Sequence, residues 1–347
     1  MSLIIRILLH LSLCSMVIVF VSCERNDIGS PVTINIDFPA LYAINSSGKS
    51  ISVINLNKQA FEISIPLEDG GLFPCQPTVS PDNKSIAIAM REQAWGEPMV
   101  LNNATKTNAV LVIDAKTCQT QKTIQISGSP LKALYSPTKP ELWVAVLTSQ
   151  ATSEIQVFNT DTWVKINEIE LGGILTDLCL SKNKQNLYAI GVQPARFYSI
   201  DLNTWSIETS GNLSIDFPKS IQTAFWDEAI ITGQSEATLI RPTDGYTYNS
   251  KYLGSTTGYS AISPGGILWI PYSSWIDRTT PGFNSWTDQN NLYMSGNVHS
   301  IVFSSKTDRF YASIPSLNSV YSGDVNNTST ESKTGAGSNP TGLVLIE

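Results

Sequence analysis

Histidine is almost absent from this chain of 347 residues, because only His10 and His299 occur. A metal site built from several imidazoles is therefore excluded by count. A Ser-His-Asp triad would have to use His299, since we expect His10 to leave with an N-terminal signal, and no GxSxG nucleophile elbow accompanies it. These absences argue against most hydrolases.

Motifs for phosphates and calcium are also missing. The sequence contains no GxxxxGK[ST], no GxGxxG and no DxDxDG loop. Two carboxylates about 5 to 10 Å apart would suffice for a glycosidase, and the candidate acids are Glu68, Asp69, Asp177 and Asp277. Surface solvation explains most of these acids equally well. We therefore expect no metal and no cofactor, and keep hydrolysis as an alternative.

Cysteines are few, and positive charge is in deficit. Cys75 and Cys118 fall in the same predicted sheet, at the start of its first strand and at the turn between its third and fourth strands. They should lie about three strand spacings of about 4.8 Å apart, beyond disulfide reach. Free thiols are expected, buried at Cys75 and Cys179. With 22 Lys plus Arg against 29 Asp plus Glu, the formal net charge is −7, which disfavours nucleic acid as a partner.

No stretch after residue 22 has a helical period. Instead, a short apolar segment recurs, with copies ending at Ser80, Ser136, Ser181, Ala224, Ser263, Ser304 and Ile346, at intervals of 56, 45, 43, 39, 41 and 42 residues. Runs rich in Val, Ile, Tyr and Phe follow each copy and are separated by Asn, Asp, Gly, Ser and Pro, as in strands and turns. The period is that of a four-stranded blade. The sequence therefore predicts an all-β fold, a seven-bladed β-propeller over residues 39–347.

The seventh copy, in SNPTGLVLIE, is a strand without a following partner. Residues 41–55 (LYAINSSGKSISVIN), in contrast, lack the strand that should precede them. We expect the C-terminal strand to close blade 1, because an open ring would leave unpaired edges and exposed blade faces.

The N-terminus has the pattern of a secretory signal. Arg6 precedes an apolar run that ends at Ser22, and Phe20-Val21-Ser22-Cys23 is similar to a bacterial lipobox, with Phe20 in place of the usual Leu. We expect a lipoprotein signal at 1–22, acylation of Cys23 that anchors the chain to a membrane, and a tether at 23–38. The alternative is an ordinary signal with an incidental cysteine. Glu24 after the cysteine favours the outer membrane, facing either the cell surface or the periplasm.

Two predicted connections between the second and third strands of a blade are unusually long. We call the end of the ring where the innermost strands begin the top face, and these connections share it. They place on that face Arg91, Trp95, Trp275, Asp277 and Arg278. Aromatic groups among a few charges suit a binding site, although each Trp could equally pack against its own loop.

A second group of candidates comes from matching positions of the innermost strands. These positions hold Gln76, Lys132, Asp177, Ser220, Tyr259, Ser300 and Gly342, with Lys219 and His299 beside them. They predict a polar ring in the central channel. Such groups could contact a ligand, or could hydrogen-bond between blades and to channel water. Lys132 and Asp177, on adjacent blades, suit an inter-blade ion pair.

Trp163 and Trp205 recur at matching places after the third strands of two blades. Recurrence with the repeat favours packing over ligand binding. Trp143 and Trp269 fall inside predicted strands and are expected in the core.

The segments AVLVIDAKTCQTQKTIQISGSPLKALYSP and SISVINLNKQ resemble the YVTN or YncE-like propeller repeat, in which an apolar strand, Asp or Asn, a short turn and a second strand precede Gly, Pro and Ser-Pro-Asp. The resemblance covers about residues 39–347 and weakens in blades 5 and 6. Lipid-anchored members of this group resemble surface proteins that capture ligands, cobalamin among them, above an outer-membrane transporter. Fold by itself does not carry function.

These observations lead us to expect a non-enzymatic, lipid-anchored envelope propeller, monomeric in solution, that binds a small molecule, such as a cobalamin-like one, or a partner protein on its top face. An outer-membrane transporter is the expected kind of protein partner. The alternatives are a lactonase-like or glycosidase-like hydrolase that uses channel carboxylates, and a scaffold for an envelope complex.

Overall fold

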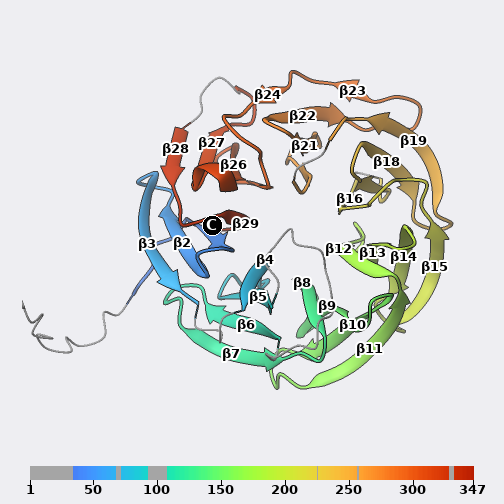
Figure 1. Cartoon of the computed structure of the whole chain (residues 1–347), viewed down its shortest axis with the longest axis horizontal. Helices are drawn as coiled ribbons and strands as arrows, with labels where there is room; N and C mark the ends of the chain where they lie inside the picture. Colours follow the sequence, from blue (N-terminus) through green and yellow to red (C-terminus); the bar gives the residue numbers. More distant parts are fainter. Residues whose placement is uncertain (1–33, 68–71, 93–107, 225, 256–257, 328–331) are drawn as a thin grey trace, which may run out of the picture. The chain divides into compact units, whose positions relative to one another are not determined.

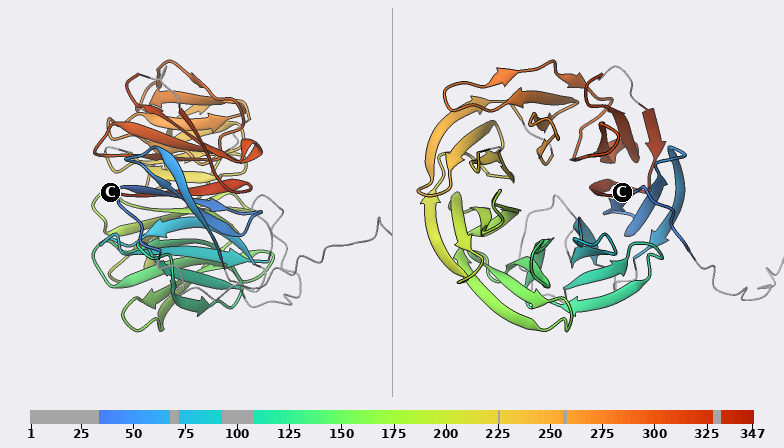
Figure 2. Two further views of the ribbon diagram at one scale, coloured as in Figure 1. Left: turned by 90° about the vertical axis from the view of Figure 1, so that its left-hand side faces the viewer. Right: turned by 180° about the vertical axis from the view of Figure 1, so that it is seen from behind.

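The computed structural model describes residues 34–67, 72–92, 108–224, 226–255, 258–327 and 332–347. Asn35–Glu347 form one compact unit, in which the described residues build seven antiparallel sheets around a central axis (Figure 1 and Figure 2). The predicted seven-bladed propeller is confirmed. A 3-10 turn at Pro315–Leu317 is the one helical segment among the described residues.

Each blade runs from an innermost strand a to an outermost strand d. Blade 1 consists, in that order, of β29 (Pro340–Ile346), β1 (Ala40–Asn45), β2 (Ser50–Asn55) and β3 (Ala60–Pro66). Blade 2 consists of β4 (Phe73–Val79), β5 (Ser85–Arg91), β6 (Ala109–Asp114) and β7 (Thr120–Gln125). Blade 3 consists of β8 (Ser129–Tyr135), β9 (Glu141–Leu147), β10 (Thr152–Asn159) and β11 (Lys165–Gly172). Blade 4 consists of β12 (Ile174–Leu180), β13 (Asn186–Val192), β14 (Arg196–Asp201) and β15 (Ser206–Asn212). Blade 5 consists of β16 (Ser220–Thr223), β17 (Ala229–Thr232), β18 (Glu236–Arg241) and β19 (Tyr246–Tyr252). Blade 6 consists of β20 (Ala261–Ile262), β21 (Leu268–Tyr272), β22 (Trp275–Thr280) and β23 (Thr287–Asp288), and β24 (Leu292–Tyr293) also pairs with β22. Blade 7 consists of β25 (Ser300–Phe303), β26 (Arg309–Ile314), β27 (Ser319–Asp324) and β28 (Ser332–Gly335).

Blade 1 is closed by the C-terminal strand, as predicted. β29 pairs with β1 in an antiparallel register that runs from Ala40 opposite Ile346 to Ile44 opposite Gly342. A side chain at Gly342 would meet the next blade, because a Cβ there would lie 2.5 Å from Cδ of Pro77. The strand therefore completes one sheet and packs tightly against another.

The recurring Asp or Asn at the end of strand c explains the short turn that follows it. The carboxylate of Asp114 accepts hydrogen bonds from the backbone N–H groups of Lys116 and Thr117 at 2.9 and 2.7 Å. Asn159, Asp201 and Asp324 accept equivalent pairs of bonds. Such side chains replace a backbone partner at a turn, which accounts for their recurrence in the repeat.

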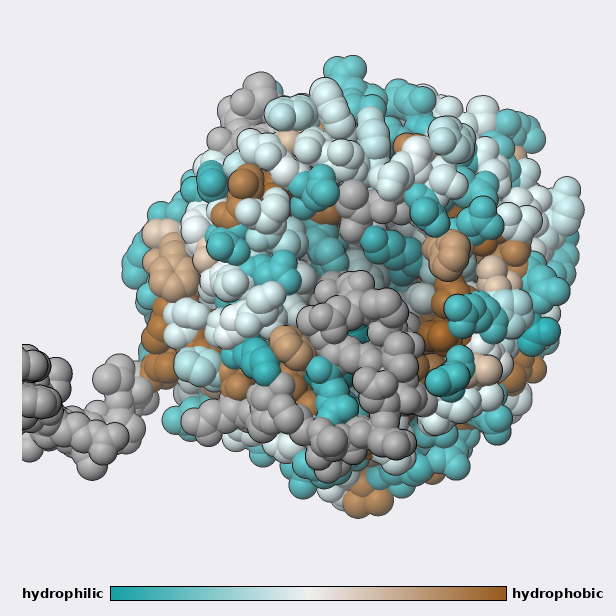
Figure 3. Space-filling view, viewed as in Figure 1, coloured by the Kyte–Doolittle hydropathy of each residue, from teal (hydrophilic) through white to brown (hydrophobic). Residues whose placement is uncertain are grey.

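The core lies between neighbouring blades rather than on one side of a sheet. Trp143 and Trp269 are fully buried, as expected, and Trp205 packs edge-on against Trp143 with ring centroids 5.8 Å apart. Trp163 packs against the cluster between blades 2 and 3, so both recurrent tryptophans pack against the core. Most residues on the face of the ring seen in Figure 3 are hydrophilic, and apolar side chains are scattered among them.

Candidate functional site

A cavity of about 430 Å³ lies on the ring axis and is lined from the innermost region of every blade. Its lining comes from β4, β8, β12, β16, β20 with the two residues before it, β25 and β29. A volume in this range accommodates a small organic ligand. The cavity thus lies where the sequence predicts the polar ring.

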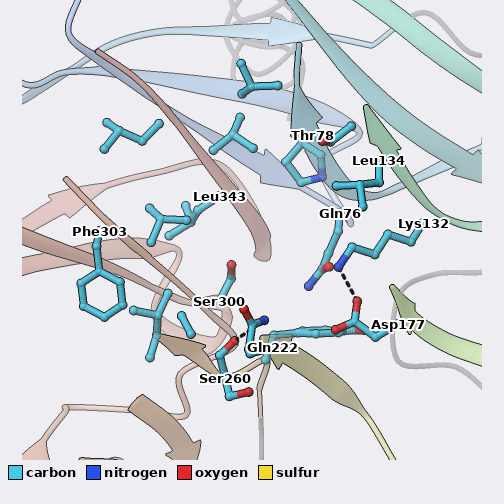
Figure 4. A pocket seen from close by; sticks show the side chains of 18 of the residues that line it. Gln76, Thr78, Lys132, Leu134, Asp177, Gln222, Ser260, Ser300, Phe303 and Leu343 are labelled. Atoms are coloured by element: carbon cyan, nitrogen blue, oxygen red, sulfur yellow. Dashed lines mark hydrogen bonds and ion pairs between the residues drawn. The ribbon is translucent and has the colours of Figure 1, made fainter. Parts of the chain in front are cut away.

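The lining changes character along the axis. Because the innermost strands begin at the top face, their earlier residues line the upper part and their later residues the lower part. The upper part holds polar side chains such as Gln76 and Lys132, and the lower part holds Leu134, Phe303 and Leu345. Figure 4 shows Gln76, Lys132 and Asp177 together, apart from Leu343 and Phe303. The cavity is therefore amphipathic.

Lys132 and Asp177 form the predicted ion pair between blades 3 and 4 (Figure 4). The Lys132 side chain is 18% exposed and that of Asp177 is fully buried. Nζ of Lys132 also donates to the Leu178 carbonyl at 3.0 Å, and the second carboxylate oxygen of Asp177 accepts the Ile221 N–H of blade 5 at 2.9 Å. Both oxygens of Asp177 are therefore engaged in holding three blades together.

Tyr259 and His299 lie side by side at the junction of blades 6 and 7, with ring centroids 5.7 Å apart. Nδ1 of His299 donates to the Thr341 carbonyl of blade 1 at 2.7 Å. Burial, together with the charge of Lys219, lowers the pKa of His299 to about 4. Burial also raises the pKa of Tyr259 and lowers that of Lys219. At neutral pH the imidazole and the phenol are consequently uncharged.

Arg91 ends β5 on the top face and is 3% exposed. It lies beside Cys75, where burial raises the pKa of the thiol and the guanidinium offsets part of that rise. Its charge also acts on Tyr259, which lines the cavity. Arg91, Lys132 and Lys219 thus bring positive charge to the upper part, whereas Asp177 is the one carboxylate among the described lining residues.

Gln76 and Gln222 differ in how their amides are used. The amide of Gln222 donates to the Ser260 carbonyl at 3.1 Å and joins blades 5 and 6. The side chain of Gln76 lines the cavity and makes no hydrogen bond to a described residue. Gln76 is therefore available to a ligand, while Gln222 mainly supports the ring.

Sequence reasoning missed several lining residues. Gln222 lies two positions after Ser220 and so shares its face of β16, a signal that was present in the sequence. Ser260 follows Tyr259, and its hydroxyl shares a hydrogen bond of 3.0 Å with the hydroxyl of Ser220 in blade 5. Ser220 itself is buried and is not among the lining residues. Phe303 and Leu343 were not predicted, because apolar residues are common in every strand of the repeat and nothing in the sequence distinguishes these two.

The placement of Asp277 and Arg278 in a top-face loop was wrong. They lie in strand β22 and are 6% and 8% exposed, because only two residues separate β21 from β22. Asp277 pairs with Lys251 of blade 5 at 2.8 Å. Arg278 donates to the Val325 carbonyl of blade 7 at 3.1 Å and lies over the ring of Trp269. Both residues join blades.

Trp275 begins β22 and is 40% exposed. Its ring packs edge-on against Tyr293, with centroids 5.0 Å apart. It is not among the residues that line the axial cavity. Trp95, its predicted companion, and Cys23 lie outside the described residues, as do Glu68 and Asp69.

The three cysteines in the described residues are free thiols, as predicted. Cys75 is buried, and Cys179 is only half-buried. Within the same part of the chain, no group of three His, Cys, Asp or Glu residues is arranged to hold a metal ion. No helix in the described ranges has the length and apolar character needed to cross a membrane.

Comparison with known proteins supports the fold. No family model matches the chain, and no curated protein matches it in sequence. A solved protein of unknown function from Desulfotomaculum acetoxidans is similar to it, with TM-score 0.69 and 9% identity over 88% of this chain and 98% of that one. A candidate 6-phosphogluconolactonase from Bacteroides fragilis is also similar, with TM-score 0.66 and 11% identity over 92% of this chain and 100% of that one. The structure of U3-55K is similar with TM-score 0.63 and 13% identity, over 82% of this chain and 89% of that one. At such identities the likeness concerns the propeller fold alone.

Proposed function

We propose that this propeller is a non-enzymatic binding protein whose axial cavity takes a small molecule from the top face. The observation that carries this proposal is the cavity of about 430 Å³, which is lined from the innermost region of all seven blades. A concave site with a few polar groups on an apolar wall is the usual form of a small-molecule site.

The ligand is an amphiphile with an anionic group. Its charged end lies toward Lys132, with Arg91 and Lys219 nearby, and hydrogen-bonds the amide of Gln76. Its apolar end lies toward Leu134 and Phe303.

Hydrolysis is less well supported. A glycosidase needs two carboxylates that flank its substrate, and among the described lining residues only Asp177 carries one. Both of its oxygens are already engaged by Lys132 and by the Ile221 N–H. Asp277, the other described candidate acid, pairs with Lys251 away from the cavity.

We further propose that the chain is a YncE-like lipoprotein of the outer membrane that passes its ligand to a transporter there. The support is the lipobox-like Phe20–Cys23 and the propeller repeat. Intact-mass measurement of the purified protein should show an acylated N-terminal Cys23, and Cys23→Ala should release the protein from the membrane fraction. A Cys23→Ala protein that stays in the membrane would contradict the anchor.

Incubation of the compact unit, residues 35–347, with an envelope extract tests the binding function. Mass spectrometry of what the protein retains should identify a small anionic amphiphile. Retention of an outer-membrane protein without any small molecule would instead favour a scaffold. Gln76→Leu should reduce retention of the small molecule about tenfold, because it removes a polar contact from the cavity without breaking a bond between blades.

A further inference from the structure

Four aromatic side chains form a row on the bottom face, the end of the ring where the innermost strands end. Trp226 lies in the turn between strands a and b of blade 5, Tyr246 and Tyr248 begin β19 after the turn between strands c and d, and Phe283 lies in the connection that follows β22. Ring centroids are 5.5 Å apart for Trp226 and Phe283, 4.9 Å for Phe283 and Tyr248, and 5.6 Å for Tyr248 and Tyr246. Two neighbouring blades thus build one continuous aromatic surface.

Three of the four rings are exposed, although large aromatic groups gain most from burial, and Tyr248 is half-buried against the core beneath them. Trp226 is 61% exposed, Tyr246 58% and Phe283 40%. A contiguous exposed apolar surface of this kind marks an interaction site more often than a single exposed side chain does.

The row is also held in place by polar contacts. The carboxylate of Asp227, next to Trp226, accepts the Lys182 N–H of blade 4 at 2.6 Å and so fixes the turn. The guanidinium of Arg241 lies 5.4 Å from the ring centroid of Tyr246, and its Nε donates to Asp244 at 2.9 Å. A preformed surface loses little conformational entropy on binding.

We propose that this aromatic row binds a neutral saccharide chain. Aromatic faces stack on the C–H faces of pyranose rings. The planes of Trp226 and Phe283 are tilted by only 34° to each other, so these two rings can offer such faces side by side, whereas Tyr248 meets Phe283 and Tyr246 edge-on at 74° and 84° and supports the row. Arg241 and Asp244 lie at the end of the row and can exchange hydrogen bonds with hydroxyl groups. Since this pair is neutral overall and the chain is acidic, charge complementarity favours a neutral glycan over an acidic one or a nucleic acid.

Affinity electrophoresis of the full chain tests the proposal, in a detergent without a sugar headgroup. The gels contain hydroxyethylcellulose, xyloglucan or galactomannan as neutral probes. At least one probe should retard the protein, and Trp226→Ala and Phe283→Ala should each weaken that retardation at least tenfold. Trp275→Ala is the matched control, because it removes an exposed aromatic ring outside the row. The Trp275→Ala protein should be retarded as much as the wild type.

Two outcomes would overturn the saccharide site. One is the absence of retardation by all three polysaccharides. The other is equal retardation of the wild type and Trp226→Ala, with both proteins folded by circular dichroism. If sedimentation velocity shows a dimer that Trp226→Ala dissociates, and no polysaccharide retards the protein, the row is a contact between copies of this chain. Binding in the axial cavity is independent of each of these results.

Discussion

At the scale of single residues, Asp177 both lines the cavity and stabilises the contacts between blades. It is fully buried, pairs with Lys132 and accepts the Ile221 N–H. Asp177→Ala would leave a largely buried ammonium and a buried N–H without this partner. We expect a loss of about 2 to 4 kcal/mol in the free energy of unfolding, measured by urea titration.

The exposed pair Lys165 and Glu168 supplies the control for this prediction. Its side chains are 43% and 56% exposed, so Glu168→Ala should cost less than about 1 kcal/mol. Equal losses in the two variants would contradict the structural importance assigned to Asp177.

His299 should make stability depend on pH. Its pKa in the folded chain is about 4, below the ordinary value of 6.5, so the unfolded chain takes up the proton first as the pH falls. The contribution of the neutral imidazole is complete above about pH 6.5 and is lost between there and pH 4. Because the ring is half-buried, we expect a loss of about 1 to 2 kcal/mol.

Urea unfolding of the wild type and His299→Gln at pH 7.5 and pH 4.5 measures this dependence. Other acids titrate in both proteins, so the difference between the two pH responses is the relevant quantity. The variant should lose less stability on acidification. An identical fall in both proteins would show that the imidazole does not titrate as inferred.

At the scale of elements, β29 is the strand whose removal should matter most. Truncation after Asn339 removes the innermost strand of blade 1 and the register from Ala40 to Asn45. The truncated chain should lose its cooperative thermal transition or melt at least about 10 °C lower, since the loss exposes a strand edge and a blade face. A midpoint equal to that of the full chain would contradict closure by β29.

Gly342 within β29 allows a finer test. A Cβ at this position would lie 2.5 Å from the ring of Pro77, whereas one at Gly335 in β28 would meet no atom within 4 Å. Gly342→Ala should therefore cost about 1 to 3 kcal/mol in urea unfolding, and Gly335→Ala should cost much less. Equal effects would argue against tight packing between blades 1 and 2.

Blade 6 shows the limit of sequence reasoning about elements. The apparent length of the connection predicted a loop at Asp277 and Arg278, but in the structure they are buried strand residues that bind Lys251 and the Val325 carbonyl. Those partners lie 26 and 47 residues away along the chain, in blades 5 and 7. No local pattern reveals such compensation, so a buried charged strand was interpreted as an exposed loop.

At the scale of the whole molecule, the period of the repeat was enough to predict the number of blades and the closing strand. It also placed Gln76, Lys132 and Asp177 together, because equal positions in equal strands lie at equal height around a ring. The bond that Lys132 makes between blades was predicted, but the sequence did not show that Gln76 makes no such bond to a described residue. Lys132 and Gln76 both line the cavity, yet only Lys132 binds a neighbouring blade.

The central claim is that the axial cavity binds the ligand. Thr78 lines the cavity from β4, so Thr78→Trp should fill it without removing a contact between blades. The measurement is calorimetric titration of the retained small molecule into the wild type, Thr78→Trp and Trp275→Ala, all with matched unfolding midpoints. The account predicts at least a hundredfold loss of affinity in Thr78→Trp and none in Trp275→Ala. Unchanged affinity in folded Thr78→Trp would contradict it.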